Sequence, residues 1–151
     1  MEEAVVEALV LVALIGIATI LGGYMVYSST MIAKSIEERS AKNTAANIEA
    51  SILEACTNHF ARPDRPSRYD SVTITINLTG RSTVWLRPWG IIVEPQSKTR
   101  ALISRQSLED LCSRALGTRV NVQIAEGSIV GTQISLELKL QEGNLTIRPA
   151  G

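Results

Sequence analysis

The sequence has few of the residues that catalysis and nucleic-acid binding require. It contains one histidine, two cysteines, two tryptophans, three tyrosines and one phenylalanine, and its formal net charge at pH 7 is zero. A chain without excess positive charge lacks the electrostatic footprint that attracts nucleic acid. The scarcity of aromatic side chains argues against a surface that stacks bases. We therefore expect no nucleic-acid partner.

Patterns that bind cofactors or perform catalysis are also missing. The single histidine, His59, falls near the end of a predicted helix, where it more often meets the helix dipole than ligates a metal. No cluster of histidine, cysteine and carboxylate residues has metal-ligand spacing. No glycine-rich phosphate loop is present, because Gly22 and Gly23 lie inside an apolar run. The sequence thus predicts no enzyme, no catalytic residue, no metal and no cofactor.

A long stretch without charge dominates the N-terminal region of the chain. After Glu7 no charged residue occurs until Lys34. An apolar run of roughly 20 or more residues is long enough to cross a lipid bilayer as a helix. A signal peptide would stop sooner and would show a small-residue cleavage site. We expect a helix that is retained and is buried by lipid or by copies of the same chain.

The helix is expected to continue beyond the apolar run, because 28–60 contains neither proline nor glycine. Apolar residues recur there at helical spacing in two stripes, Met31, Ile32 and Ile36, then Ala45, Ile48, Ile52 and Cys56. We predict one helix from near Glu3 to near His59. The segment 1–27 is apolar, and the segment 28–60 is amphipathic.

Beyond this helix the apolar period changes from that of a helix to that of strands. A linker with two prolines is predicted at 61–68 and a β-rich domain at 69–151. The predicted strands are Val72–Thr79, Ser82–Leu86, Ile91–Val93, Arg100–Ser104, Arg119–Ile124, Gln133–Leu140 and Leu145–Arg148, with Gly80 as a turn. The predicted core of this domain comprises Val72, Ile74, Ile76, Ile134, Leu136 and Leu138.

One short helix interrupts these strands. Ser107 is its expected capping residue, and Gly117 follows its last residue, Leu116. With a single short helix among the strands, we expect an antiparallel sheet formed by hairpins. The predicted fold class is α+β, with a long N-terminal helix before a small antiparallel domain.

The segment AVVEALVLVALIGI, residues 4–17, resembles the N-terminal segment of type IV pilins. In that family a glutamate opens an apolar helix and a glycine follows nine residues later, as Gly16 follows Glu7 here. The Glu-Ala-Leu triplet, and the Gly22-Gly23-Tyr24 sequence near the end of the apolar run, are more similar to archaeal members of the family than to bacterial ones. The resemblance covers about the first fifth of the chain.

The resemblance implies a structural subunit of an extracellular filament that polymerises through its N-terminal helix. The implied partners are copies of the same chain, the cell membrane before assembly, and a prepilin peptidase with its assembly machinery. Two alternatives remain open. The chain is a membrane-anchored minor pilin or envelope adaptor, or the helix only tethers a separate binding or enzymatic domain.

The flanks of the helix raise a question of topology. Glu2 and Glu3 precede it and Lys34 follows it, which by the positive-inside rule would place the C-terminal domain in the cytoplasm. Family members carry a leader that ends in a basic residue and a glycine. A basic leader, removed after insertion, would reverse the orientation, so we expect this sequence to be close to a mature chain.

Glu7, Gly16, Gly22 and Gly23 are the expected assembly residues. A carboxylate buried among apolar helices needs a positive or donor group on a neighbour. Small residues let helices approach closely. The alternatives are that Glu7 only interacts with the helix dipole and that the glycines only loosen the helix.

Two features favour an exported domain. Cys56 and Cys112 both fall on predicted helices, and an even cysteine count favours one disulfide over two buried thiols. Asn77 and Asn144 each begin an Asn-Leu-Thr triplet that fits the glycosylation pattern. Either triplet alone also occurs by chance.

Overall fold

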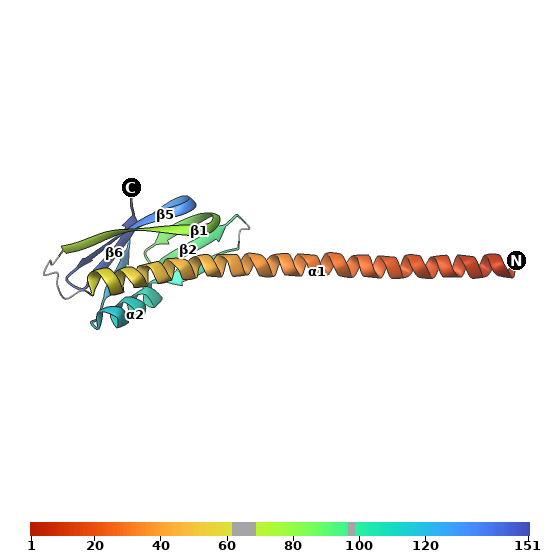
Figure 1. Cartoon of the computed structure of the whole chain (residues 1–151), viewed down its shortest axis with the longest axis horizontal. Coiled ribbons are helices and arrows are strands. Elements are labelled where there is room, and N and C mark those ends of the chain that lie inside the picture. Colours follow the sequence, from red (N-terminus) through yellow and green to blue (C-terminus); the bar gives the residue numbers. More distant parts are fainter. Residues whose placement is uncertain (62–68, 97–98) are drawn as a thin grey trace. The chain divides into compact units, whose positions relative to one another are not determined.

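The computed structural model describes residues 1–61, 69–96 and 99–151. Its elements are α1 (Glu2–Ala55), the π-helical turn η1 (Cys56–Phe60), β1 (Tyr69–Arg87), β2 (Gly90–Pro95), β3 (Ala101–Ser104), α2 (Arg105–Leu116), β4 (Asn121–Ile124), β5 (Gly127–Gln141) and β6 (Asn144–Pro149) (Figure 1). The α+β class and the long N-terminal helix are confirmed. Of the predicted linker 61–68, only Ala61 lies within the described residues.

The chain forms two compact units, which we call the helix unit (Met1–Ile36) and the sheet unit (Glu37–Gly151). Every described side chain of the helix unit is exposed except the half-buried Ser28. Its hydroxyl groups donate back to the helix, Thr19 Oγ1 to the Ile15 carbonyl at 2.8 Å and Thr30 Oγ1 to the Tyr27 carbonyl at 2.8 Å. These hydroxyls are satisfied within the helix and do not require water.

The sheet has the strand order β3-β2-β1-β5-β6-β4. All neighbours are antiparallel except β4 and β6, which are parallel. The expectation of a purely antiparallel sheet is therefore wrong at one edge. The chain reaches β4 through α2 and not through a hairpin, and a helical connection leaves a strand free to run parallel to its neighbour.

The predicted turn at Gly80 is also wrong, because β1 continues through it to Arg87. The register against β5 shifts there: Asn77 pairs with Gln133 and Ser82 pairs with Gly131. Five residue steps along β1 therefore lie opposite two residue steps along β5. The extra residues form a bulged irregularity that bends the strand without reversing it. Glycine is a signal for bulges as well as for turns.

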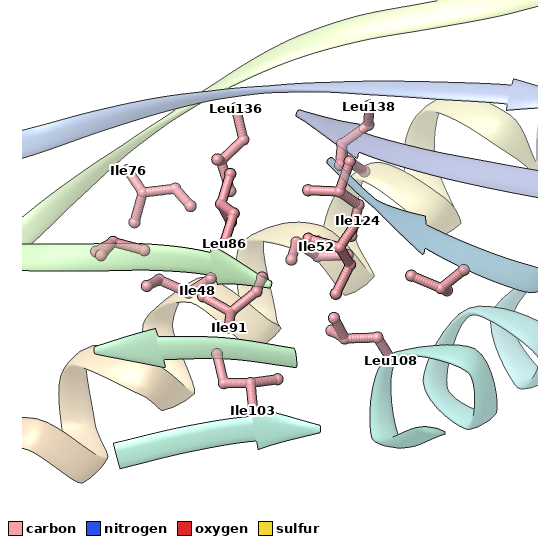
Figure 2. Packing of buried hydrophobic residues seen from close by; sticks show 14 of the residues in the cluster. Ile48, Ile52, Ile76, Leu86, Ile91, Ile103, Leu108, Ile124, Leu136 and Leu138 are labelled. Atoms are coloured by element: carbon pink, nitrogen blue, oxygen red, sulfur yellow. The ribbon is translucent and has the colours of Figure 1, made fainter. Parts of the chain in front are cut away.

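Both helices of the sheet unit cover the same face of the sheet (Figures 1 and 2). Ile48 and Ile52 of α1 and Leu108 of α2 pack there against inward strand residues, which include Ile76, Leu86, Ile91, Ile103, Leu136 and Leu138. The predicted core is confirmed for Ile76, Ile134, Leu136 and Leu138, which are buried. Val72 and Ile74 are only partly buried at its margin.

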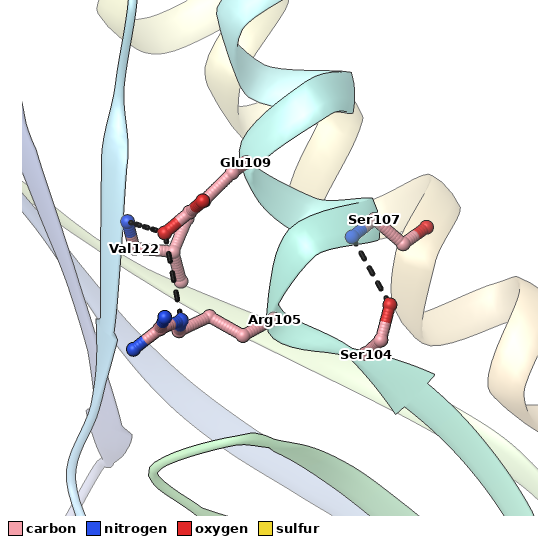
Figure 3. Close-up of polar contacts among 5 residues, drawn as sticks. All are labelled: Ser104, Arg105, Ser107, Glu109 and Val122. Carbon is pink, nitrogen blue, oxygen red and sulfur yellow. Dashed lines mark hydrogen bonds and ion pairs between the residues drawn. The ribbon is translucent and has the colours of Figure 1, made fainter.

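Helix α2 begins at Arg105 and is capped by Ser104, not by Ser107 as predicted. Ser104 has an extended backbone, and its Oγ accepts a hydrogen bond of 3.1 Å from the Ser107 amide (Figure 3). The Ser107 hydroxyl instead donates to Glu49 Oε1 at 3.4 Å. The predicted end is confirmed, because Gly117 adopts the left-handed conformation at φ 70° that favours glycine.

Candidate functional site

The most unusual surface of this chain is the apolar surface of the helix unit. Its large apolar side chains are more than half exposed, among them Val5, Val6, Leu9, Val10, Leu11, Val12, Leu14, Ile15, Ile17, Ile20, Leu21, Met25, Val26 and Ile32. Among the described residues, α1 with η1 is the one helix long and apolar enough to cross a membrane. No described residue covers this segment. Such a surface indicates contact with lipid or with protein.

Glu7 lies in a shallow depression of about 300 Å³ on this surface, lined also by Val6, Val10, Leu11 and Leu14. The structure gives its carboxylate no hydrogen bond or ion pair with any described residue. If the surrounding apolar side chains are buried, this carboxylate needs a positive or donor group. No described residue supplies that group.

The three glycines of the helix have no internal reason to be glycine. A Cβ added at Gly16, Gly22 or Gly23 would meet no atom within 4 Å. Each glycine in a helix interior costs about 1 kcal/mol relative to alanine. Gly16 and Gly23 are two turns apart on nearly the same face, while Gly22 is turned by about 100°. The geometry leaves room at Gly16 and Gly23 for a close neighbour outside the chain.

The sheet unit brings the predicted cysteine pair together. Cys56 is the first residue of η1 and Cys112 lies on α2, and both are fully buried free thiols. A hydrogen bond to Cys112, together with burial, raises the pKa of the Cys56 thiol. The same bond lowers the pKa of Cys112, because the Cys56 thiol can donate to a Cys112 thiolate. The covalent bond between them stays a prediction.

The two predicted glycosylation sites differ in surroundings. Asn77 is exposed on the sheet face opposite the helices, and its Oδ1 accepts a hydrogen bond of 3.0 Å from Gln133 Nε2. Asn144 is half-buried at the start of β6, directly after the Glu142-Gly143 turn. Attachment of sugars at either position stays a prediction, which peptide mass spectra of native material would check.

Sequence reasoning missed the side chains of α2 that bind the edge strand β4. Glu109 Oε1 accepts from the Val122 amide at 3.2 Å and is paired with Arg105 at 3.6 Å (Figure 3). Ser113 Oγ accepts from the Val120 amide at 3.0 Å. Only the spacing of 109 and 113, one helical turn apart, could have placed them on one face.

Two other polar features of the sheet unit are His59 and an open groove. His59 lies in the turn that ends the long helix, as predicted. Its ring packs edge to face against Phe60, with the ring centroids 5.1 Å apart. An open groove of about 520 Å³ between α1 and β3 has acids and bases interspersed along it, Glu38, Lys42, Glu49 and Arg100. In the portion of the chain that the structure describes, no three histidine, cysteine or carboxylate residues are placed to hold a metal ion.

Comparisons with protein-family models, with characterised proteins and with solved structures find no significant match to this chain.

Proposed function

We propose that this chain is the structural subunit of an extracellular filament of the type IV pilus-like class, assembled through the N-terminal half of α1. One observation carries the proposal: the helix unit exposes an apolar surface on all sides, and no described residue of the chain covers it. Lipid covers that surface in the precursor. Copies of the same helix cover it in the assembled filament.

The energetic argument follows from the area involved. Each Å² of apolar surface removed from water contributes about 25 cal/mol before the costs of association. A helix that is apolar all round cannot be covered by one flat neighbour, because every face needs a partner. A bundle of identical helices satisfies this requirement. When two different surfaces of the same subunit bind each other, repetition of that heterologous contact generates an open helical polymer.

The arrangement of the C-terminal half of α1 supports a subunit over a simple tether. Ala41, Ala45, Ile48 and Ile52 lie on one stripe of the same helix and are buried in the sheet unit. The assembly segment is therefore continuous, as helix, with a core element of the folded unit. A plain membrane anchor does not require this continuity.

The second candidate is a minor pilin or an envelope adaptor that remains in the membrane. The same exposed apolar helix supports it, because one spanning helix suffices for anchoring. The location of the protein separates the two. A filament subunit is recovered in sheared extracellular fibres, whereas an anchored adaptor stays in the membrane fraction.

The test of the assembly role is a Glu7→Ala variant, produced together with its assembly machinery. If Glu7 meets a positive or donor group on a neighbouring helix, the yield of sheared filaments should fall roughly tenfold or more, because one partner of a buried pair is removed. Electron microscopy and quantified shear fractions measure the yield.

The matched control is Glu3→Ala, which removes another exposed carboxylate, in the first turn of α1. It should leave the yield near that of the unchanged chain. Equal yields from both variants would contradict a pairing role for Glu7 and leave only its interaction with the helix dipole.

A further inference from the structure

The cysteine pair occupies a position that joins three elements of the sheet unit. Cys56 is the last buried residue of the long helical segment, and it lies in the same buried cluster as Cys112 of α2, a helix that packs against η1. Glu109 and Ser113 on the same helix α2 bind the backbone of β4 and the residue before it. A bond between the two sulfurs would therefore connect the end of α1, through α2, to the β4 edge of the sheet.

Burial restricts when such a bond can form. The exposed fraction of both cysteines is 0%. Thiol–disulfide exchange requires an attacking thiolate in contact with a sulfur of the oxidant. A folded protein oxidant cannot reach either sulfur in the closed unit. Oxidation must therefore precede closure of the core or occur through local opening of α2 or η1.

We propose that Cys56 and Cys112 are a redox site oxidised by a protein disulfide during folding, and that the resulting bond then holds the end of α1 in the closed core. The pair is oxidised in an open intermediate and shielded once the unit closes. This proposal goes beyond the filament function and stands without it.

The exchange balances as two successive steps. The Cys112 thiolate attacks one sulfur of the oxidant's disulfide, which forms a mixed disulfide and releases the other sulfur as a thiolate. The Cys56 thiolate then attacks the Cys112 sulfur and releases the second thiolate of the oxidant. Two electrons pass to the oxidant, and the two protons lost by the cysteines end on its thiols.

The bond would act on α1 more than on any other element. It closes a loop of roughly 55 residues, which includes β1, β2 and β3. Release of α1 from the sheet would expose Ile48 and Ile52, which are buried in the core. A crosslink at Cys56 limits that release in the unfolded ensemble as well as in the native state.

The first test is the intact mass of the full chain purified in detergent from an oxidising envelope. We expect a mass two hydrogens below that of the reduced chain, and no alkylation of either thiol until denaturant and reductant are both present. Alkylation of both thiols without reductant would overturn the proposal.

The second test concerns shielding. Reduced, folded full-length chain is mixed with an oxidised thiol–disulfide oxidoreductase, with and without mild denaturant. We expect oxidation at least about 100-fold slower in the native state, since it must wait for opening. Equal rates in the two conditions would mean that the sulfurs are accessible and would overturn the shielding.

The third test measures what the bond does. On the chain-entropy model, reduction should lower the unfolding temperature by roughly 10–20 °C. The matched control is the double variant Cys56→Ala, Cys112→Ala, whose unfolding temperature should not respond to reductant. An unchanged unfolding temperature of the reduced parent chain would contradict a stabilising bond.

Discussion

The helix unit and the sheet unit differ in the exposure of their apolar side chains. In the sheet unit, Ile48 and Ile52 are 0% and 1% exposed beneath the strands. In the helix unit, Ile15 and Ile32 on the same helix α1 are 57% and 60% exposed. Both segments belong to the same α-helix, so helix formation itself does not explain the difference.

The distribution of apolar residues around the helix explains it. Between Ala41 and Cys56 the buried residues, single or in adjacent pairs, recur every three or four positions, with mostly polar residues between them. One sheet face covers that stripe. Before Ile36 apolar residues occur on every side of the helix, and no single surface can cover them. Substitutions should therefore act on folding in the sheet unit and on assembly in the helix unit.

The largest effect is expected from removal of Met1–Ser28. The shortened chain should remain folded, because the buried core lies entirely within the sheet unit. It should be soluble without detergent and should form no filaments. Sedimentation and electron microscopy measure assembly, and circular dichroism measures folding. Fibres from the shortened chain would place the contacts between sheet units and favour the tether interpretation of the helix.

Gly16→Leu should abolish filaments or change their diameter. A Cβ added at Gly16 meets no atom within 4 Å, so the variant should fold normally. It would hold apart any neighbouring helix that approaches Gly16 closely. Gly16→Ala is the matched control and should retain more assembly. Filaments of unchanged diameter and symmetry with leucine would show that Gly16 faces no neighbour.

Ile52→Ala should destabilise the sheet unit by about 2–5 kcal/mol, since it leaves a cavity among buried side chains. Ile32→Ala, the same change on the same helix, should alter the free energy of unfolding by less than about 0.5 kcal/mol. Urea unfolding in detergent measures both variants. Comparable destabilisation by the two would mean that the helix unit is covered by another segment of its own chain.

The helices and most strands could be predicted because they depend on local patterns. The 3.6-residue period located the second half of α1, a capping serine and Gly117 located α2, and strict alternation located the strand around Ile134 and Leu136. The predictions were wrong where the local sequence is compatible with two different local structures. Gly80 suits a turn or a bulge, and pairing with β5 decides for the bulge. Ser104 and Ser107 both suit a helix cap, and only the path of β3 selects the first.

The candidate site was predictable to a similar degree. Glu7 and the glycines could be identified because the apolar residues around them are their neighbours in the sequence. The meeting of Cys56 and Cys112 could be proposed from their number and apolar faces, but their contact depends on how two helices pack on one sheet. The bonds from Glu109 and Ser113 to the β4 edge were not foreseeable, because the parallel pairing of β4 with β6 is set by distant residues.

The smallest expected effect concerns an ion pair on the sheet face opposite the helices. Arg148 donates from Nε to Glu137 Oε2 at 2.7 Å and from Nη2 to Glu137 Oε1 at 2.8 Å, between paired positions of β5 and β6. These hydrogen bonds hold the pKa of Glu137 below its ordinary value. A carboxylate with a lowered folded pKa stabilises the fold above its unfolded pKa of about 4.3. That stabilisation is lost as pH falls through the lower folded pKa.

Glu137→Gln should therefore lower the stability of the sheet unit slightly at neutral pH and bring it level with the parent chain in strong acid. Glu126→Gln, at an exposed carboxylate, is the matched control and should show no such convergence. Urea midpoints measured from about pH 7 down to about pH 2, below the unfolded pKa of a glutamate, test both variants. The difference should also shrink in high salt, because the pair is solvent-accessible. A difference that persisted unchanged into strong acid would assign the effect of Glu137 to packing and not to charge.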